Sequence, residues 1–138
     1  MSIHHIVEAG YVVVEPIQDP LEQPTWLPAA SNDLLAYATP IIGPLSTLIV
    51  HRMAWYFAAG DNWHQFELDE LGRTFGVAGV GVNSPLIRSL GRIDRFGFGQ
   101  LDASRPKLRI RPMIPPLSRR LAERLPQYLQ DTCPYIVR

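Results

Sequence analysis

The segment Asn83–Gly99 (NSPLIRSLGRIDRFGFG) constrains the fold more than any other part of the chain. Ser84 followed by Pro85 is a typical helix start, because serine caps free backbone amides and proline suits the first turn. An apolar stripe then follows at helical spacing: Leu86, Leu90, Ile93 and Phe96. The pattern predicts a helix over residues 84–96 that packs one side against a hydrophobic core.

The other side of this predicted helix carries a row of arginines, Arg88, Arg92 and Arg95. They repeat at the same helical spacing, displaced by roughly half a turn from the apolar stripe, and Asp94 lies off their row. Gly91 interrupts the helix and makes it softer by about 1 kcal/mol relative to alanine. A solvated cationic face is common on helices, so the row does not define a function by itself.

A second basic element follows at once. In KLRIR, the cations Lys107, Arg109 and Arg111 alternate with Leu108 and Ile110, as in a strand with one basic side. With FGFGQL before it and DASRP as the turn, the sequence predicts a β-hairpin over residues 98–111. An arginine-rich helix followed by a basic hairpin favours a surface that binds the phosphates of a nucleic acid.

Charge is divided between the two parts of the chain, although the 138 residues have zero formal net charge. Residues 1–82 hold two cations and nine anions, a net charge of −7, whereas residues 83–138 hold eleven cations and four anions, a net charge of +7. A phosphate backbone responds to a local patch of charge, so this asymmetry favours a polyanionic partner for the second part.

The remaining segments predict a single domain with two extensions. Residues 1–42 form an arm with a short strand at YVVVE and a short helix that Ser31 or Asn32 caps and Pro40 ends. Residues 44–59 are apolar almost all round and predict a buried central helix. Residues 114–138 predict a helical extension that Ser118 caps. This helix either packs back on the core with its arginines solvated, or takes part in dimerisation or in an extended phosphate contact. Its arginines are Arg119, Arg120 and Arg124.

The predicted elements follow the order helix 44–59, strand 65–67, helix 68–75, helix 84–96 and hairpin 98–111. This order is similar to that of the bacterial winged helix-turn-helix superfamily, and FELDELGRTFGV resembles the second helix of such domains. Gly72 stands where that pattern usually has alanine, and Phe75 where it has leucine. RFGFG resembles the usual end of the recognition helix. The resemblance covers roughly residues 43–113 and implies an α+β, mostly α, winged-helix domain.

This resemblance implies a recognition helix in the major groove, with its N-terminal part nearest the bases. Asn83, Ser84 and Arg88 are then the candidates for base contacts, with Arg88 able to fork onto a guanine. Five cations would hold phosphates: Arg92, Arg95, Lys107, Arg109 and Arg111. Neutralising about four to six phosphates predicts a salt slope of about −4 to −5 in log K against log salt. Double-stranded DNA is the expected partner, bound by a small bacterial or phage transcriptional regulator, with a homodimer left open.

The sequence predicts neither an enzyme nor a metal or cofactor site. The four histidines show no ligand spacing, Cys133 is the only cysteine, and no nucleophile, base and orienting acid can be assembled. No small-molecule ligand is predicted. No apolar run reaches the roughly 18 residues of a membrane span, and MSIHHIVEAG lacks the features of a signal peptide, so a cytoplasmic location is expected.

An interaction module remains as an alternative to DNA binding. The same arginine face could meet an acidic surface of a partner protein, and the acidic first part could serve as a docking side. The two hypotheses differ in whether loss of the arginines changes retention on DNA.

Overall fold

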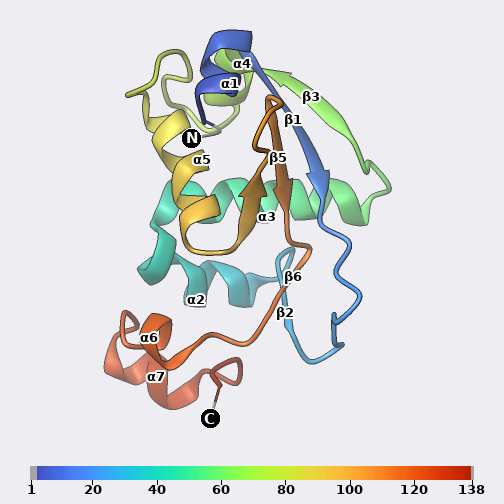
Figure 1. Ribbon diagram of the computed structural model, residues 1–138. Coiled ribbons are helices and arrows are strands. Elements are labelled where there is room, and N and C mark those ends of the chain that lie inside the picture. The colour runs from blue at the N-terminus through green and yellow to red at the C-terminus, as the bar shows by residue number, and fades with distance from the viewer. Residues whose placement is uncertain (1–2, 138) are drawn as a thin grey trace.

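The computed structural model describes residues 3–137 (Figure 1). Its helices are α1 (Ile3–Ala9), α2 (Asn32–Ile42), α3 (Pro44–Ala58), α4 (Leu68–Thr74), α5 (Pro85–Arg95), α6 (Arg119–Ala122) and α7 (Gln127–Thr132). Its strands are β1 (Tyr11–Pro16), β2 (Leu27–Pro28), β3 (His64–Glu67), β4 (Gly99–Leu101), β5 (Lys107–Ile110) and β6 (Met113–Ile114). The architecture is α+β and mostly helical, as predicted.

The predicted order of elements is confirmed between residues 44 and 110. The central helix, short strand, second helix, arginine-bearing helix and hairpin appear as α3, β3, α4, α5 and β4–β5. Each begins within one residue of its predicted start, because caps and glycines mark these boundaries clearly in the sequence. Helix α1 was not predicted.

A four-stranded mixed sheet has the order β3-β1-β5-β4. β1 therefore lies in the middle, antiparallel to β3 and parallel to β5, with Glu15 opposite Arg109. The predicted hairpin is confirmed as the antiparallel pair β4–β5. A separate two-stranded sheet pairs β2 with β6 and ties the N-terminal arm to the chain after the hairpin.

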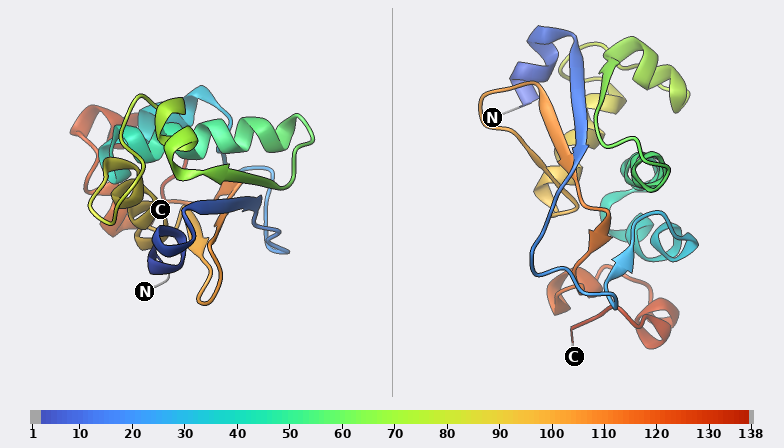
Figure 2. Two further views of the ribbon diagram at one scale, coloured as in Figure 1. Left: turned by 90° about the horizontal axis from the view of Figure 1, so that it is seen from above. Right: turned by 90° about the vertical axis from the view of Figure 1, so that its right-hand side faces the viewer.

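Helices cover one face of the four-stranded sheet. In Figure 2 (right) α3 is seen end-on with α2 below it, and β1 and β5 lie to the left of these two helices. Side chains that alternate along β1 and β5, such as Val12, Val14, Leu108 and Ile110, point into this layer and are buried. They join the buried stripe of α5 in one hydrophobic cluster. The opposite face of β5 carries its cations.

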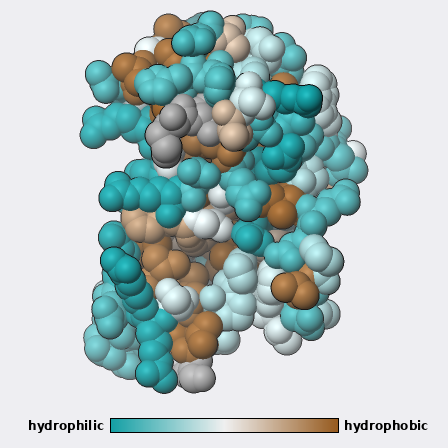
Figure 3. All heavy atoms as spheres, viewed as in Figure 1, coloured by the Kyte–Doolittle hydropathy of each residue, from teal (hydrophilic) through white to brown (hydrophobic). Residues whose placement is uncertain are grey.

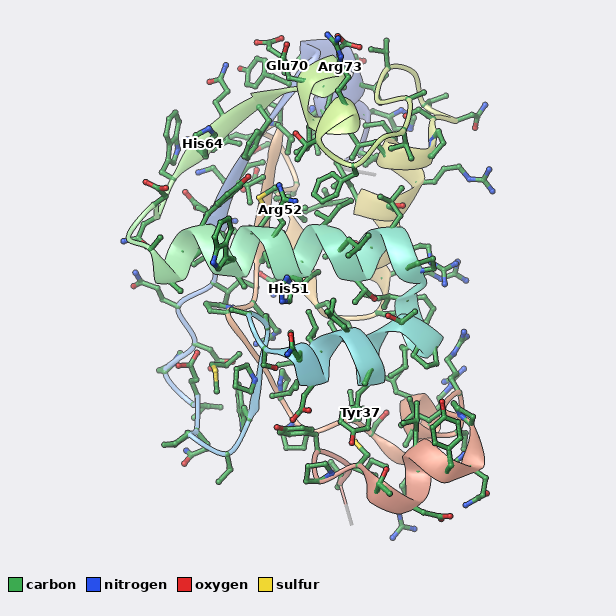
Figure 4. The ribbon with its side chains drawn as sticks, turned by 180° about the vertical axis from the view of Figure 1, so that it is seen from behind. Tyr37, His51, Arg52, His64, Glu70 and Arg73 are labelled. Atoms are coloured by element: carbon green, nitrogen blue, oxygen red, sulfur yellow. The ribbon has the colours of Figure 1, made fainter. Side chains whose placement is uncertain are left out.

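Helix α3 is less buried than its apolar sequence predicts. Ile49, Val50 and Met53 are buried, but Trp55 is 58% exposed and Leu48 is 47% exposed. Figure 4 shows this helix from behind, with Arg52 above it and His51 below it. One side of α3 packs against the sheet and α2, while the other faces outward because no element of the described chain covers it.

Both extensions differ in detail from the prediction. Ser31 caps α2 as expected, but Pro40 lies inside the helix, which ends at Ile42 with Gly43 as its C-cap. Proline removes one backbone donor, whereas Gly43, with φ of 86°, changes the chain direction. Ser118 caps α6 as predicted, yet the C-terminal region forms two short helices, since Pro126 stands between α6 and α7.

Candidate nucleic-acid interface

Helix α5 forms for the reasons that its sequence indicates. The Ser84 hydroxyl accepts a hydrogen bond from the Ile87 amide at 3.3 Å, and Pro85 occupies the first turn. Leu86, Leu90 and Ile93 are fully buried. Ser84 itself is only 8% exposed. The Ser84 hydroxyl is therefore occupied within the helix cap and is not free to contact a base, whereas Asn83 beside it is exposed.

The arginine row lies on the outer face of α5. Arg88, Arg92 and Arg95 are exposed, and none of them forms an ion pair with a carboxylate in residues 3–137. The nearby Asp94 contacts the first strand of the hairpin instead, since its Oδ1 accepts a hydrogen bond from the Leu101 amide at 3.0 Å. The three guanidinium groups of the row are therefore not held in ion pairs within residues 3–137.

Arg92 also connects α5 to α2. Its Nε donates to the Ile42 carbonyl at 2.9 Å, and its Nη2 lies 3.5 Å from the Ile41 carbonyl. These carbonyls belong to the last turn of α2, where the helix leaves acceptors unpaired and carries a partial negative charge. Arg92 thus fixes the packing of the two helices as well as adding to the row.

Three guanidinium groups surround the ring of Phe96, the residue that follows α5. The Cζ atoms of Arg92, Arg95 and Arg124 lie 5.5, 5.8 and 4.8 Å from the ring centroid. Arg124 comes from the turn after α6, and the sequence identified it only as one of three C-terminal cations. Nothing in the sequence places it beside α5, because that contact depends on how the C-terminal extension docks.

The cations of the hairpin are occupied by carboxylates. Lys107 and Arg109 lie 3.4 and 3.0 Å from Glu15, and Arg111 lies 2.9 Å from Asp19. Arg109 also lies 3.3 Å from Asp102. The predicted alternation along β5 is confirmed, but β1 brings Glu15 to these cations, and the segment after β1 brings Asp19. The positive charges of Lys107, Arg109 and Arg111 are therefore paired with carboxylates, unlike those of the arginine row.

A hollow of about 620 Å³ lies against the outer face of α5, between this helix, the end of α1 and the hairpin. Its apolar lining comprises Ile3, Val82, Ile87, Gly91 and Leu101, and its charged lining comprises Arg88, Arg92, Asp94 and Arg95. Figure 3 shows hydrophilic side chains projecting from the left edge of the molecule, over α5 and the C-terminal helices. The surface therefore combines an apolar floor with a cationic rim.

The hairpin turn makes stability sensitive to acid. Asp102 accepts hydrogen bonds from the Ser104 amide, the Arg105 amide and the Ser104 hydroxyl, and with Arg109 these lower its pKa from 3.8 to about 2. A lowered pKa stabilises the folded state above pH 3.8, and this contribution disappears as the pH falls towards 2. We expect the free energy of unfolding to fall over that range in urea titrations, and Asp102→Asn to make the fall shallower. An unchanged pH profile in the variant would contradict this role.

Two other kinds of feature are absent from the described residues. Within residues 3–137 there is no group of three or more His, Cys, Asp or Glu side chains placed to hold a metal ion. In the same range, no helix combines the length and apolar character needed to cross a bilayer. Comparisons with protein-family models, with curated proteins and with solved structures find no match to this chain.

Proposed function

We propose that the chain is a winged helix-turn-helix protein that binds double-stranded DNA through α5, as a small bacterial or phage transcriptional regulator. The observation that carries this proposal is the arginine row of α5, exposed and without carboxylate partners in residues 3–137. A cationic helix whose opposite face is buried offers phosphates three charges from one rigid element. The order α3-β3-α4-α5-β4-β5 supports the assignment of the domain.

The contacts can be divided by position along the helix. Asn83 and Arg88 stand at the N-terminal end and are proposed to contact base edges, where a guanidinium can fork onto guanine. Arg92 and Arg95, towards the other end, are proposed to hold phosphates. Lys107, Arg109 and Arg111 are not part of this set, because their charges are already paired. A homodimer across paired half-sites and a cytoplasmic location belong to the same proposal.

A salt-titrated binding assay on pooled genomic fragments tests this function. With about two phosphates neutralised, by Arg92 and Arg95, log K should fall with log salt at a slope near −2, shallower than if the hairpin took part. Arg109→Gln should change DNA affinity by less than about twofold, because Arg109 already serves Glu15 and Asp102. A slope near zero would contradict DNA binding. A slope near −5 that becomes shallower in Arg109→Gln would show that the hairpin also contacts phosphates.

The hollow beside α5 favours a second candidate function, binding of an acidic segment of a partner protein. Apolar side chains at its floor could bury apolar groups of that segment, while the arginine rim would pair with its carboxylates. If the chain binds such a partner and not DNA, it should not be retained on duplex DNA, and Arg88→Ala should not change its retention. The DNA-binding hypothesis expects Arg88→Ala to relax sequence preference.

A further inference from the structure

The cluster at Phe96 joins two segments that are far apart in the sequence. Arg92 and Arg95 belong to α5, whereas Arg124 lies about thirty residues later, between α6 and α7. All three Cζ atoms lie within 5.8 Å of the ring centroid. The aromatic face attracts each cation through its quadrupole but carries no net charge. Three positive charges are therefore gathered around one ring, and none of them forms an ion pair with a carboxylate of residues 3–137.

The position of Arg124 is determined by the packing of its neighbours. Leu125 is buried, and its carbonyl accepts a hydrogen bond from Gln130 Nε2 at 2.8 Å. The Arg124 amide donates to the Leu121 carbonyl at 3.0 Å. Farther along, the Tyr135 hydroxyl donates to Asp33 at 2.8 Å and fastens the extension to α2. The guanidinium of Arg124 is thus presented to Phe96 by a folded segment rather than by a free tail.

The chemistry of the cluster fits a phosphate group. Guanidinium groups are planar, remain charged, and present paired N–H donors that match the oxygens of a phosphate. Arg92 uses Nε and Nη2 on the carbonyls of α2, and no hydrogen bond in residues 3–137 occupies the guanidinium groups of Arg95 or Arg124. Because all three residues are exposed, an anion can reach them from solvent.

We propose that Arg92, Arg95 and Arg124 form a binding site for one phosphate group, so that the C-terminal extension completes the anion-binding surface of α5. The assignment of this phosphate to the backbone of duplex DNA rests on the proposed function. In that case the site extends the DNA contact past the end of the recognition helix. A free phosphate compound is the other source of the same chemistry.

Thermal unfolding in pyrophosphate, at ionic strength matched with sodium chloride, tests the site without DNA. Pyrophosphate should raise the unfolding temperature of the wild-type chain and of Arg120→Gln, an equal change of charge at an exposed position on α6. Arg124→Gln should weaken pyrophosphate binding by about tenfold or more, as expected for loss of a charge-assisted hydrogen bond. Arg124→Lys, which keeps the charge but not the fork, should recover part of the binding.

DNA titrations separate this site from the proposed function. If DNA is the source of the phosphate, Arg124→Gln should also make the salt slope shallower by about 1, and Arg120→Gln should leave it unchanged. If pyrophosphate binding depends on Arg124 while the wild-type chain binds no DNA, the phosphate site stands and the DNA function fails. No stabilisation of the wild type by pyrophosphate, or equal stabilisation of wild type and Arg124→Gln, overturns the site.

Discussion

Replacing Gly79 by alanine should lower the free energy of unfolding by about 3 kcal/mol, at the upper end of the range for overpacking. A Cβ atom at this position would overlap the Leu68 carbonyl group and lie 3.1 Å from Cδ2 of Leu86. Gly79 is buried where the loop after α4 passes across the first residue of that helix. The substitution therefore forces two backbone segments apart rather than moving one side chain.

The surroundings of Gly79 leave little room for adjustment. The Leu68 amide donates to the Gly10 carbonyl at 3.1 Å, which ties the start of α4 to the turn before β1. The Leu86 amide lies 3.3 Å from the Ala78 carbonyl, which ties the loop to α5. Because α5 carries the arginine row, a shift at Gly79 should also disturb the candidate interface. Urea titration of wild-type and variant chains measures the effect.

Gly91→Ala is the matched control, since it adds the same methyl group within α5 itself. A Cβ at Gly91 would have nothing within 4 Å, so this helical glycine serves no close approach of another backbone. Alanine should stabilise the chain by about 0.5–1 kcal/mol through its higher helix propensity. Equal effects of the two substitutions would show that the packing around Gly79 is looser than the structure indicates.

Reversing the charge of Arg88 and Arg95 together, to glutamate, should weaken DNA binding by about a hundredfold or more. Each lost hydrogen bond of a charged guanidinium removes about 1.5–3 kcal/mol, and the introduced carboxylates add repulsion from the phosphates. Both arginines are exposed and form no ion pair in residues 3–137, so the free energy of unfolding should change by less than about 1 kcal/mol. Fluorescence anisotropy with a labelled duplex measures affinity, and urea titration checks the fold.

The double variant Arg119→Glu with Arg120→Glu supplies the control for net charge. It makes the same change of charge on exposed positions of α6, outside the arginine row and the cluster at Phe96. Its affinity for DNA should fall only a few fold, through the weaker long-range field. If both double variants lose affinity equally, binding follows the overall charge of the C-terminal part, and a defined role for α5 is refuted.

Local sequence determined most of the elements from 44 to 110. Ser84 and Pro85 mark the start of α5, and the apolar stripe of this helix predicts which side is buried. The alternation Lys107 to Arg111 predicts the two sides of β5. These patterns are readable because caps, helical spacing and strand alternation act between residues within a few positions of one another. Helix α1 lacks such signals, and Pro40 lies within α2 although proline usually precedes or follows a helix.

Only the tertiary structure decided which charged side chains are paired and which are not. Glu15 neutralises Lys107 and Arg109 because β1 lies beside β5 in the sheet, a pairing between residues about ninety positions apart. Arg124 joins Phe96 because the C-terminal extension docks near the end of α5. A sequence shows that a side chain is charged and which face of its own element it occupies. Which other element faces it depends on long-range packing, because electrostatic partners are set by distance in space and not along the chain.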